Sequence, residues 1–542
     1  MHQFKLAPSW LRFLVIFLLV VGVFFRFANL DRKVYWHDET YTSLRISGYT
    51  VKEVKQQLFN NRVITAKSFD KYQRPNSEKN LSDTIKSLAI EDSQHPPLYY
   101  IIARFWVQIF GNSVIAIRSL SAFISLLVFP CVYWLCKELF KVPLSVPFLA
   151  VSLVAISPIH LIYAQEAREY ILWLVTILLS SASLLRAIRL ESKTKKLPKG
   201  QKAPNLIFTW GIYALTLTLS FYTFILSGFV AVAHGIYLII IERFKQTKTA
   251  KAYFLASLAA FIGFIPWILV VLSNFSQFES TTSWTKTPVN FLVLISSWLI
   301  QLNRIFFDLN FGFENPLSYL ITPIILFLIG SAIYFICQRT NQKTWLFIVL
   351  LIVVPAVPLI FADLLFGGIR SLSDRYLLPS YLGIQLAVAY LLANQLYNGS
   401  LARRQIWRLI IGFVIICGVI SCGFSSQADT WWSKVISSGN PQVAKIINQA
   451  SYPLLISDSS GINYGNVFSL SYLLESKVRL MLLKDEKISQ IPDGFTEIYL
   501  LNPSNSLRKK IGKIYKSKIN IVYQDNYSSL YQLAKPRRLR RS

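Results

Sequence analysis

Long apolar runs separated by polar connections occupy most of the chain. Each run is long enough to cross a hydrocarbon core of ~30 Å as an α-helix, so we predict about eleven transmembrane helices. The runs lie near residues 11–25, 114–136, 144–165, 169–189, 205–223, 226–242, 253–273, 318–338, 344–364, 376–396 and 406–424. No small-residue cleavage site follows the first run, which indicates an uncleaved transmembrane helix.

A shorter apolar run at residues 98–110 has a different character. It is too short for an ordinary crossing, and it carries Tyr99, Tyr100 and Trp106, which are residue types that anchor helices at a membrane surface. We predict an amphipathic helix that lies in the interface of the membrane. The long connection 31–113 is therefore expected to carry juxtamembrane helices.

The pattern changes after residue 424, where short β-rich runs alternate with helix-like ones. The β-rich runs lie at 452–457, 478–483, 497–501, 519–523 and 529–533, and the helix-like runs at 441–450, 466–475 and 507–516. This alternation predicts a small α/β domain over residues 425–542, attached to a membrane domain over residues 1–424.

Composition supports a helical polytopic membrane protein. Of the 542 residues, 53% are hydrophobic and only 15% are charged, and the mean hydropathy is +0.44. Neither a soluble globular chain nor a disordered one combines these values. The five cysteines lie in or at the ends of apolar runs, which argues against a disulfide framework and against a thiolate metal site.

The net charge of +29 could suggest nucleic acid, but the positions of the basic residues indicate topology instead. Many lie in short connections that are almost free of acidic residues, and the positive-inside rule places such connections in the cytoplasm. They are 137–141, 189–202, 243–251, 339–343 and 403–408. The N-terminus is then cytoplasmic, and the C-terminal domain faces outward. We expect the basic tail 535–541 to contact anionic membrane lipids.

Four polar clusters lie at the predicted outward ends of the spans. They are Trp-His-Asp-Glu-Thr-Tyr at 36–41, Gln-His-Pro-Pro-Leu-Tyr-Tyr at 94–100, the segment 157–170, and Ser-Asp-Arg-Tyr-Leu-Leu-Pro at 373–379. Each alone fits a solvated loop or a helix start. Ionisable groups at a membrane boundary are costly unless they are paired or functional, and all four clusters share one side, so we predict one common site.

The residue types in these clusters suit a lipid-linked anion. Arginine binds phosphate oxygens in a bidentate way, and carboxylates can act as a base or hold a metal ion. An apolar bilayer lies beside the site. A substrate with an anionic phosphate and a long lipid tail fits this arrangement.

Taken in order, the clusters resemble those of a known family. The Asp-Glu pair after the first helix, His-Pro-Pro-Leu-Tyr-Tyr, Ser-Pro followed by Gln-Glu-Ala-Arg-x-Tyr, and Arg-Tyr-Leu-Leu-Pro resemble the dolichyl-phosphate-mannose-protein mannosyltransferase-like group of GT-C glycosyltransferases, to which the lipid A aminoarabinose transferases are related. The resemblance covers residues 1 to about 424 and implies a GT-C transmembrane catalytic domain.

The resemblance implies an inverting glycosyltransferase that takes a sugar from a polyprenyl-phosphate donor on the extracytoplasmic face. The acceptor would be a hydroxyl of a lipid, a cell-envelope polysaccharide or a protein. No loop is long enough for the MIR insertion of the eukaryotic protein O-mannosyltransferases, which favours an enzyme of a bacterial inner membrane. The domain 425–542 is a candidate for acceptor recognition or for a structural lid.

The resemblance also assigns roles to residues of this chain. Asp38 matches the catalytic acidic residue and would be the general base. The candidates for binding the lipid phosphate and the substrate are Arg168, Arg375, Arg118, Tyr376, Gln165 and Tyr163. The candidates for holding a divalent cation, Mg²⁺ or Mn²⁺, or for orienting the substrate are Glu39, His95 and Glu166, with His37 and His160 as weaker ones.

A rival interpretation is a transporter or flippase of a lipid-linked saccharide, without transferase chemistry. Transporters usually place ionisable groups near the midplane of the membrane, within internal repeats. Here the groups gather at one boundary and no repeat is evident, which favours an enzyme. A membrane scaffold, the second rival, would leave the four clusters unexplained.

Overall fold

The computed structural model describes residues 9–140, 145–194, 204–397, 400–484 and 490–534. The predicted basic tail 535–541 and part of the basic connection 189–202 lie outside the described residues. The chain forms two compact units, which we call the membrane unit and the sheet unit. The membrane unit comprises Met1–Ala28, Asp92–Tyr99 and Arg118–Ser426, and the sheet unit comprises Asn29–Glu91, Tyr100–Ile117 and Gln427–Ser542.

The membrane unit is a bundle of helices. Its helices are α1 (Ser9–Phe27), α8 (Val128–Leu139), α9 (Ser145–Ala155), α10 (Pro158–Ala164), α11 (Tyr170–Thr194), α12 (Leu206–Thr223), α13 (Ser227–Ile241), α14 (Lys248–Ser273), α15 (Phe275–Thr282), α16 (Phe291–Asn303), α17 (Pro316–Arg339), α18 (Gln342–Phe366), α19 (Leu378–Gln395) and α20 (Leu401–Gln427). Short 3₁₀ helices are η2 (Ser283–Lys286), η3 (Arg370–Leu372) and η4 (Asp374–Leu377). The helices α6 (Leu98–Phe110) and α7 (Val114–Leu126) contribute residues to both units.

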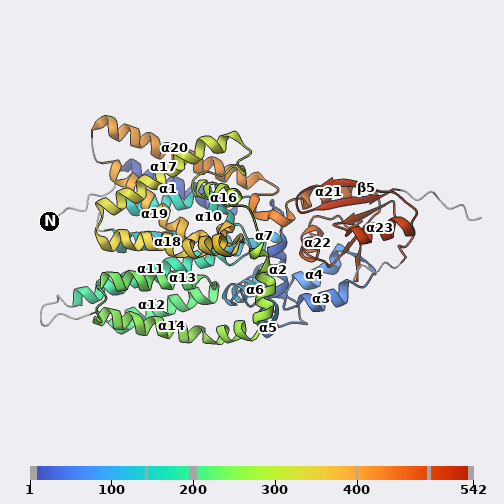
Figure 1. Ribbon diagram of the computed structural model, residues 1–542, viewed down its shortest axis with the longest axis horizontal. Helices are drawn as coiled ribbons and strands as arrows, with labels where there is room; N and C mark the ends of the chain where they lie inside the picture. Colours follow the sequence, from blue (N-terminus) through green and yellow to red (C-terminus); the bar gives the residue numbers. More distant parts are fainter. Residues whose placement is uncertain (1–8, 141–144, 195–203, 398–399, 485–489, 535–542) are drawn as a thin grey trace, which may run out of the picture. The chain divides into compact units, whose positions relative to one another are not determined.

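Among the described residues, nine helical stretches are long and apolar enough to span a membrane, and ten if the bent pair α9–α10 counts as one span. The predicted class, a helical polytopic membrane protein, is confirmed, but the count is lower than about eleven. The predicted span at 226–242 is α13, whose 15 residues rise only ~22 Å, short of a hydrocarbon core of ~30 Å. The helix α13 nevertheless packs against α18, and Figure 1 shows it beside α11, α12 and α14.

Burial separates the inner helices of the bundle from the peripheral ones. The apolar windows of α11 and of the stretch that includes α19 are each 89% buried, whereas that of α14 is 22% buried. Every backbone polar group inside a bilayer must be paired within the protein, and helices meet this requirement whichever side chains face lipid. The apolar side chains that α14 exposes, such as Phe254 and Leu269, are therefore suited to lipid contact.

The bent pair α9–α10 turns by 60° and is held by polar contacts from three other segments. Arg26 of α1 donates hydrogen bonds to the carbonyl oxygens of Ala155, at 2.6 Å, and Val154, at 3.2 Å, near the end of α9. Ser157, at the bend, donates to the carbonyl oxygen of Ile305 at 2.8 Å and accepts from Nε2 of Gln385 at 2.9 Å. The bend therefore leaves these backbone groups hydrogen-bonded, as an apolar environment requires.

The sheet unit contains a mixed sheet of six strands. The strands are β1 (Val63–Thr65), β2 (Pro453–Asp458), β3 (Arg479–Leu483), β4 (Glu497–Leu501), β5 (Ile519–Gln524) and β6 (Ser529–Leu533), in the order β1-β3-β2-β4-β6-β5. β2 runs parallel to both β3 and β4, and the other neighbouring pairs are antiparallel. The predicted C-terminal strands are thus confirmed.

The first long connection supplies one strand that the sequence did not predict. β1 pairs with β3 in antiparallel register, with Val63 opposite Met481 and Thr65 opposite Arg479. A run of 3 residues is too short to show an alternating pattern. The same connection supplies the helices α2 (His37–Ser47), α3 (Val51–Leu58), α4 (Asp70–Gln73) and α5 (Leu81–Glu91), and the 3₁₀ helix η1 (Ala66–Phe69).

Helices cover both faces of the sheet. On one face, side chains such as Leu455, Leu480 and Tyr499 pack with residues of the first connection and of α21 (Asn440–Gln449) and α22 (Asn463–Ser471). On the other face, Leu454 and Ile456 pack with α23 (Asn505–Ile514). Alternate residues of one strand therefore serve two separate cores, and Figure 1 labels these helices around the sheet.

One glycine in the bundle marks a close approach between helices. A Cβ atom at Gly22 of α1 would lie 2.5 Å from the carbonyl oxygen of Ala155, whereas a Cβ atom at Gly330 of α17 would meet nothing within 4 Å. We expect Gly22→Ala to destabilise the protein by about 1–3 kcal/mol through overpacking. Thermal unfolding of the detergent-solubilised protein measures the effect, with Gly330→Ala as the matched control. An equal loss of stability in both variants would contradict the close approach.

Candidate functional site

The four predicted clusters divide between the two units. The clusters at 94–100, 157–170 and 373–379 contribute His95, Arg168 and Arg375 to the membrane unit. The cluster at 36–41 belongs to the sheet unit.

In the membrane unit, Arg168 lies between α10 and α11 and joins a compact polar cluster. Its Nη2 atom is 3.2 Å from Nε2 of His95, 3.3 Å from Oε1 of Glu169 and 3.4 Å from the hydroxyl of Tyr170. Nδ1 of His95 is 2.8 Å from the same carboxylate oxygen of Glu169. The imidazole of His95 therefore lies between the guanidinium of Arg168 and the carboxylate of Glu169.

Glu169 supplies the negative charge of this cluster. Its side chain is fully buried, and its Oε1 atom lies 3.3 Å from Nη2 of Arg168 and 2.8 Å from Nδ1 of His95. The carboxylate therefore compensates the charge of Arg168 and contacts both Arg168 and His95.

Arg375 lies beside the same cluster, although it is distant from Arg168 in the sequence. Its guanidinium carbon lies 5.5 Å from the ring centroid of Tyr170, 5.4 Å from that of Trp284 and 5.6 Å from that of Tyr376. The guanidinium carbon of Arg168 lies 5.6 Å from the Tyr170 ring. These distances are typical of cation–π contacts, which attract a guanidinium without neutralising its charge. Two predicted phosphate ligands thus converge on one aromatic ring.

Phe224 completes the aromatic part of the site. It follows α12, and its ring centroid lies 6.4 Å from His95, 5.8 Å from Tyr170 and 5.8 Å from Tyr376. Apolar packing of this kind excludes water from around the charged groups and strengthens their electrostatic interactions. We call the set formed by Arg168, Arg375, His95, Glu169, Tyr170, Phe224, Trp284 and Tyr376 the arginine–aromatic site.

The end of α14 and the segment between α14 and α16 form hydrogen bonds with other segments of this site. Trp267 of α14 donates to the carbonyl oxygen of Ser93 at 3.0 Å, and Thr281 of α15 donates to Oε1 of Gln94 at 3.1 Å. The backbone nitrogen of Ile369 donates to the carbonyl oxygen of Thr285 at 2.8 Å. The segment therefore contacts the residues before His95 and the loop that leads to Arg375, and it carries Trp284.

An ion pair anchors the residue before Arg375. Nη1 of Arg304 lies 2.7 Å from Oδ2 of Asp374, and the hydroxyl of Tyr381 donates to Oδ1 at 2.8 Å. The Asp374 side chain is 1% exposed, whereas that of Arg304 is 17% exposed. Arg304 also lines a recess, together with Asp308 and several apolar side chains.

Several other predicted residues of the membrane unit have structural partners. Gln165 donates to the carbonyl oxygens of Phe25, at 2.7 Å, and Ala28, at 2.8 Å, at the end of α1. His160 is buried and bonds to Gln385 at 2.7 Å. These contacts fix helices to one another.

Of the remaining predicted residues of this unit, Tyr163 lies beside the site, and Arg118 and Glu166 are buried. The ring of Tyr163 packs edge-on against Tyr170 at 5.4 Å, which places it next to the arginine–aromatic site. Arg118 in α7 and Glu166 before α11 are each 1% exposed. Charged groups buried to this degree require partners within the protein.

In the sheet unit, the Asp-Glu pair lies in the first turn of α2, and its two carboxylates differ in environment. Glu39 is fully buried, and its Oε2 atom accepts from the backbone nitrogen of Trp36 at 3.3 Å and lies 3.4 Å from Nζ of Lys434. Asp38 is partly exposed. The backbone N–H groups of a first turn favour a carboxylate there. Asp38 is thus the more accessible carboxylate of the pair.

His37 is packed at the start of the same helix. Its backbone nitrogen donates to Oγ of Ser437 at 3.0 Å, and its ring lies 5.0 Å from that of Tyr41. A Cβ atom at Gly465 would lie 2.4 Å from Nδ1 of His37. The glycine therefore makes room for the imidazole, which connects α2 to α22.

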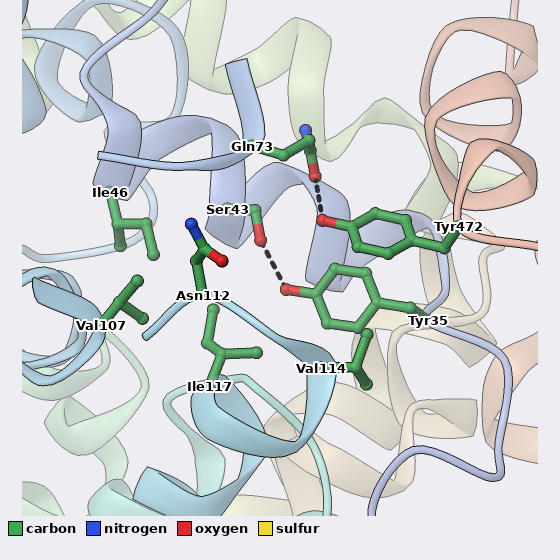
Figure 2. A pocket seen from close by; sticks show the side chains of 9 residues that line it. All are labelled: Tyr35, Ser43, Ile46, Gln73, Val107, Asn112, Val114, Ile117 and Tyr472. Atoms are coloured by element: carbon green, nitrogen blue, oxygen red, sulfur yellow. Dashed lines mark hydrogen bonds between the residues drawn. The ribbon is translucent and has the colours of Figure 1, made fainter. Parts of the chain in front are cut away.

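The sheet unit also contains a recess, shown in Figure 2. Its polar wall contains two hydrogen-bonded pairs: the hydroxyl oxygens of Tyr35 and Ser43 are 2.6 Å apart, and the hydroxyl of Tyr472 donates to the amide oxygen of Gln73 at 3.1 Å. The opposite wall is apolar and includes Val107. No carboxylate, imidazole or ammonium group lines the recess, so we assign it no chemistry.

The sequence did not single out several residues of these clusters. Glu169, Tyr170 and Asp374 lie inside the predicted motifs, but nothing in the motifs distinguishes their roles. Trp284 and Arg304 lie in a long connection without a motif, and only the fold brings them to the site.

The proposed Mg²⁺ or Mn²⁺ ligands have other partners. Glu39 contacts Lys434, and both ring nitrogens of His95 contact charged groups. Within the described ranges, no group of three or more histidine, cysteine, aspartate and glutamate side chains is placed to hold a metal ion. Two nearby guanidinium groups further disfavour a divalent cation at the arginine–aromatic site. Among the described residues, Glu39 and His95 therefore do not fit a metal centre.

Comparisons with known proteins identify the fold. No family model and no curated protein sequence matches the chain. The structure of ArnT from Cupriavidus metallidurans bound to undecaprenyl phosphate is similar over 97% of this chain and 98% of that chain, with 12% identity and a TM-score of 0.51. Its apo state is similar over the same shares of both chains, with 11% identity and a TM-score of 0.53.

A second similar structure is the oligosaccharyltransferase AglB from Archaeoglobus fulgidus, tethered to an acceptor peptide that contains the NVT sequon. The match covers 88% of this chain, with 12% identity and a TM-score of 0.51, and this chain spans 64% of that one. The same enzyme is also known in a complex with zinc and sulfate. At these identities the comparisons establish the GT-C fold of this chain, as the sequence predicted.

Proposed function

We propose that this protein is an inverting glycosyltransferase that transfers a sugar from a polyprenyl-phosphate donor to an acceptor hydroxyl on the extracytoplasmic face of a bacterial inner membrane. One observation carries the proposal. Arg168 and Arg375, which are far apart in the sequence, converge on the ring of Tyr170 at the end of a membrane-embedded bundle. A similar fold, that of ArnT, is known with undecaprenyl phosphate bound.

The arginine–aromatic site would bind the phosphate of the donor. Arg375 is partly exposed, and its guanidinium lies over the rings of Trp284 and Tyr376, which attract a cation. Arg168 is buried beside Glu169, so it adds directed hydrogen-bond donors rather than much net charge. When the bond between the sugar and the phosphate breaks, both guanidinium groups would stabilise the negative charge that develops on the leaving phosphate.

The leaving group is a phosphate, which is stable as an anion, so no general acid is required. Asp38 would accept the proton of the acceptor hydroxyl while that oxygen attacks the anomeric carbon, and a single displacement inverts the configuration there. The commitment of Glu39 to Lys434 and to the N-terminus of α2 supports Asp38 as the base of the pair.

The partners follow from this chemistry. The donor is a polyprenyl-phosphate sugar, and the acceptor is a hydroxyl of a lipid, a cell-envelope polysaccharide or a protein. The sheet unit covers one face of its sheet with helices of the first connection, so the segment that carries Asp38 and the C-terminal strands form a single compact body. That arrangement supports a role of the sheet unit in presenting the acceptor to Asp38.

Asp38→Asn tests the base. In lipid nanodiscs supplied with undecaprenyl-phosphate sugars and membrane extract as acceptor, release of undecaprenyl phosphate should fall by about 10²–10⁴-fold, because the amide cannot accept the proton. The binding of undecaprenyl phosphate should not change. Asp31→Asn is the matched control, since Asp31 is an exposed carboxylate shortly before α2. Full turnover in Asp38→Asn would exclude Asp38 as the base.

Arg375→Ala tests the phosphate site. The dissociation constant for undecaprenyl phosphate should rise by about 10-fold or more, because a charge-assisted bidentate contact is lost. Arg375→Lys should recover only part of the affinity, since an ammonium group cannot bind in a bidentate way. Arg403→Ala, which removes an exposed arginine at the start of α20, is the control. Unchanged affinity in Arg375→Ala would refute the phosphate role.

A further inference from the structure

The residue before Arg375, Asp374, forms an ion pair with Arg304, which lies in a segment without any recognised motif. Arg304 directly follows α16 and lies far from Asp374 in the sequence, yet it pairs with that carboxylate at 2.7 Å. Asp374 begins η4, and Arg375 is the next residue. An ion pair between distant segments thus lies one residue from a proposed phosphate ligand.

The Asp374 carboxylate is held at both oxygens. Arg304 contacts Oδ2, and the hydroxyl of Tyr381 donates to Oδ1 at 2.8 Å. The side chain is 1% exposed, so water cannot replace either partner. A buried carboxylate that loses its cation is strongly destabilised and attracts the nearest remaining positive charge. Along the chain, that charge belongs to Arg375.

The backbone around Arg304 is fixed on several sides of the bundle. Ser157 donates to the carbonyl oxygen of Ile305 at 2.8 Å, and the backbone nitrogen of Asp308 donates to Oγ of Ser421 at 2.9 Å. Trp298 of α16 donates to Oγ of Ser371 at 2.9 Å, which connects α16 to the loop before Asp374. The backbone that carries Arg304 is therefore hydrogen-bonded to other segments of the bundle on both sides of that residue.

We infer that Arg304 is a positioning residue for Arg375, an inference that rests on the proposed function. By compensating the charge of Asp374, Arg304 keeps that carboxylate from drawing the Arg375 guanidinium away from Tyr170, Trp284 and Tyr376. The ion pair also fixes η4, from which Arg375 extends. Arg304 itself needs no contact with the donor, because it acts through Asp374.

The inference predicts rescue by a second substitution. Arg304→Met leaves the Asp374 carboxylate without its cation, so the dissociation constant for undecaprenyl phosphate should rise by about tenfold, with kcat changed less than KM. In Arg304→Met combined with Asp374→Asn, no uncompensated carboxylate remains, and the affinity should return to within about threefold of the wild type. Asp374→Asn alone should also stay within about threefold.

A purely structural role of the ion pair gives the opposite pattern. The double variant would then bind undecaprenyl phosphate as weakly as Arg304→Met or more weakly, and this result would overturn the inference. Arg304→Lys keeps the positive charge and should disturb the fold least, so its dissociation constant for undecaprenyl phosphate should stay within about threefold of the wild type. A tenfold loss of affinity in this variant would also overturn the inference. Arg189→Met breaks a remote ion pair with Glu138 of 2.6 Å and serves as the matched control.

Two variants separate the phosphate site at Arg375 from the positioning role of Arg304. If Arg375→Ala leaves the affinity for undecaprenyl phosphate unchanged, the proposed function loses its phosphate site. If Arg375→Ala weakens binding but Arg304→Met does not, the phosphate site stands and the positioning role of Arg304 is wrong.

Discussion

The arrangement of charge in the membrane unit depends on one constraint: ionised side chains at the end of an apolar bundle must have partners inside the protein. The bundle meets this constraint in two ways. Glu169 compensates Arg168, and Asp374 compensates Arg304, each at hydrogen-bond or ion-pair distance. The guanidinium of Arg375 also lies over three aromatic rings, whose faces attract cations.

The same constraint explains why the site draws on so many segments. Arg168 and Glu169 are neighbours directly before α11, but Arg304 and Asp374 come from segments that are distant in the sequence. The residues of the site therefore come from the segments before α6 and α11, from the connection after α14 and from η4. Hydrogen bonds of Trp267, Thr281 and Thr285 link these segments. Catalysis by charge stabilisation requires donors that are already in place, and a site with its cations fixed in this way meets that requirement.

Much of the fold follows from the sequence, because hydropathy reports burial in lipid directly. The length of α13 does not follow, since hydropathy shows an apolar run but not where the backbone stops being helical. The strand β1 is too short to carry a pattern. For the site, motifs located Arg168, His95 and Arg375, but the pairing of Arg304 with Asp374 depends on the tertiary packing of distant segments. The different environments of Asp38 and Glu39 likewise arise from a lysine far along the chain.

The central claim is that two converging arginines bind the phosphate of a polyprenyl-linked sugar. Native mass spectrometry of the protein purified from membranes, with identification of the copurified lipids, tests it most directly. The account predicts a polyprenyl phosphate or a polyprenyl-phosphate sugar bound to the wild-type protein and its loss when Arg168 and Arg375 are both replaced by alanine. Equal retention of that lipid by the folded double variant, or bound lipids without any polyprenyl phosphate in the wild type, would contradict it.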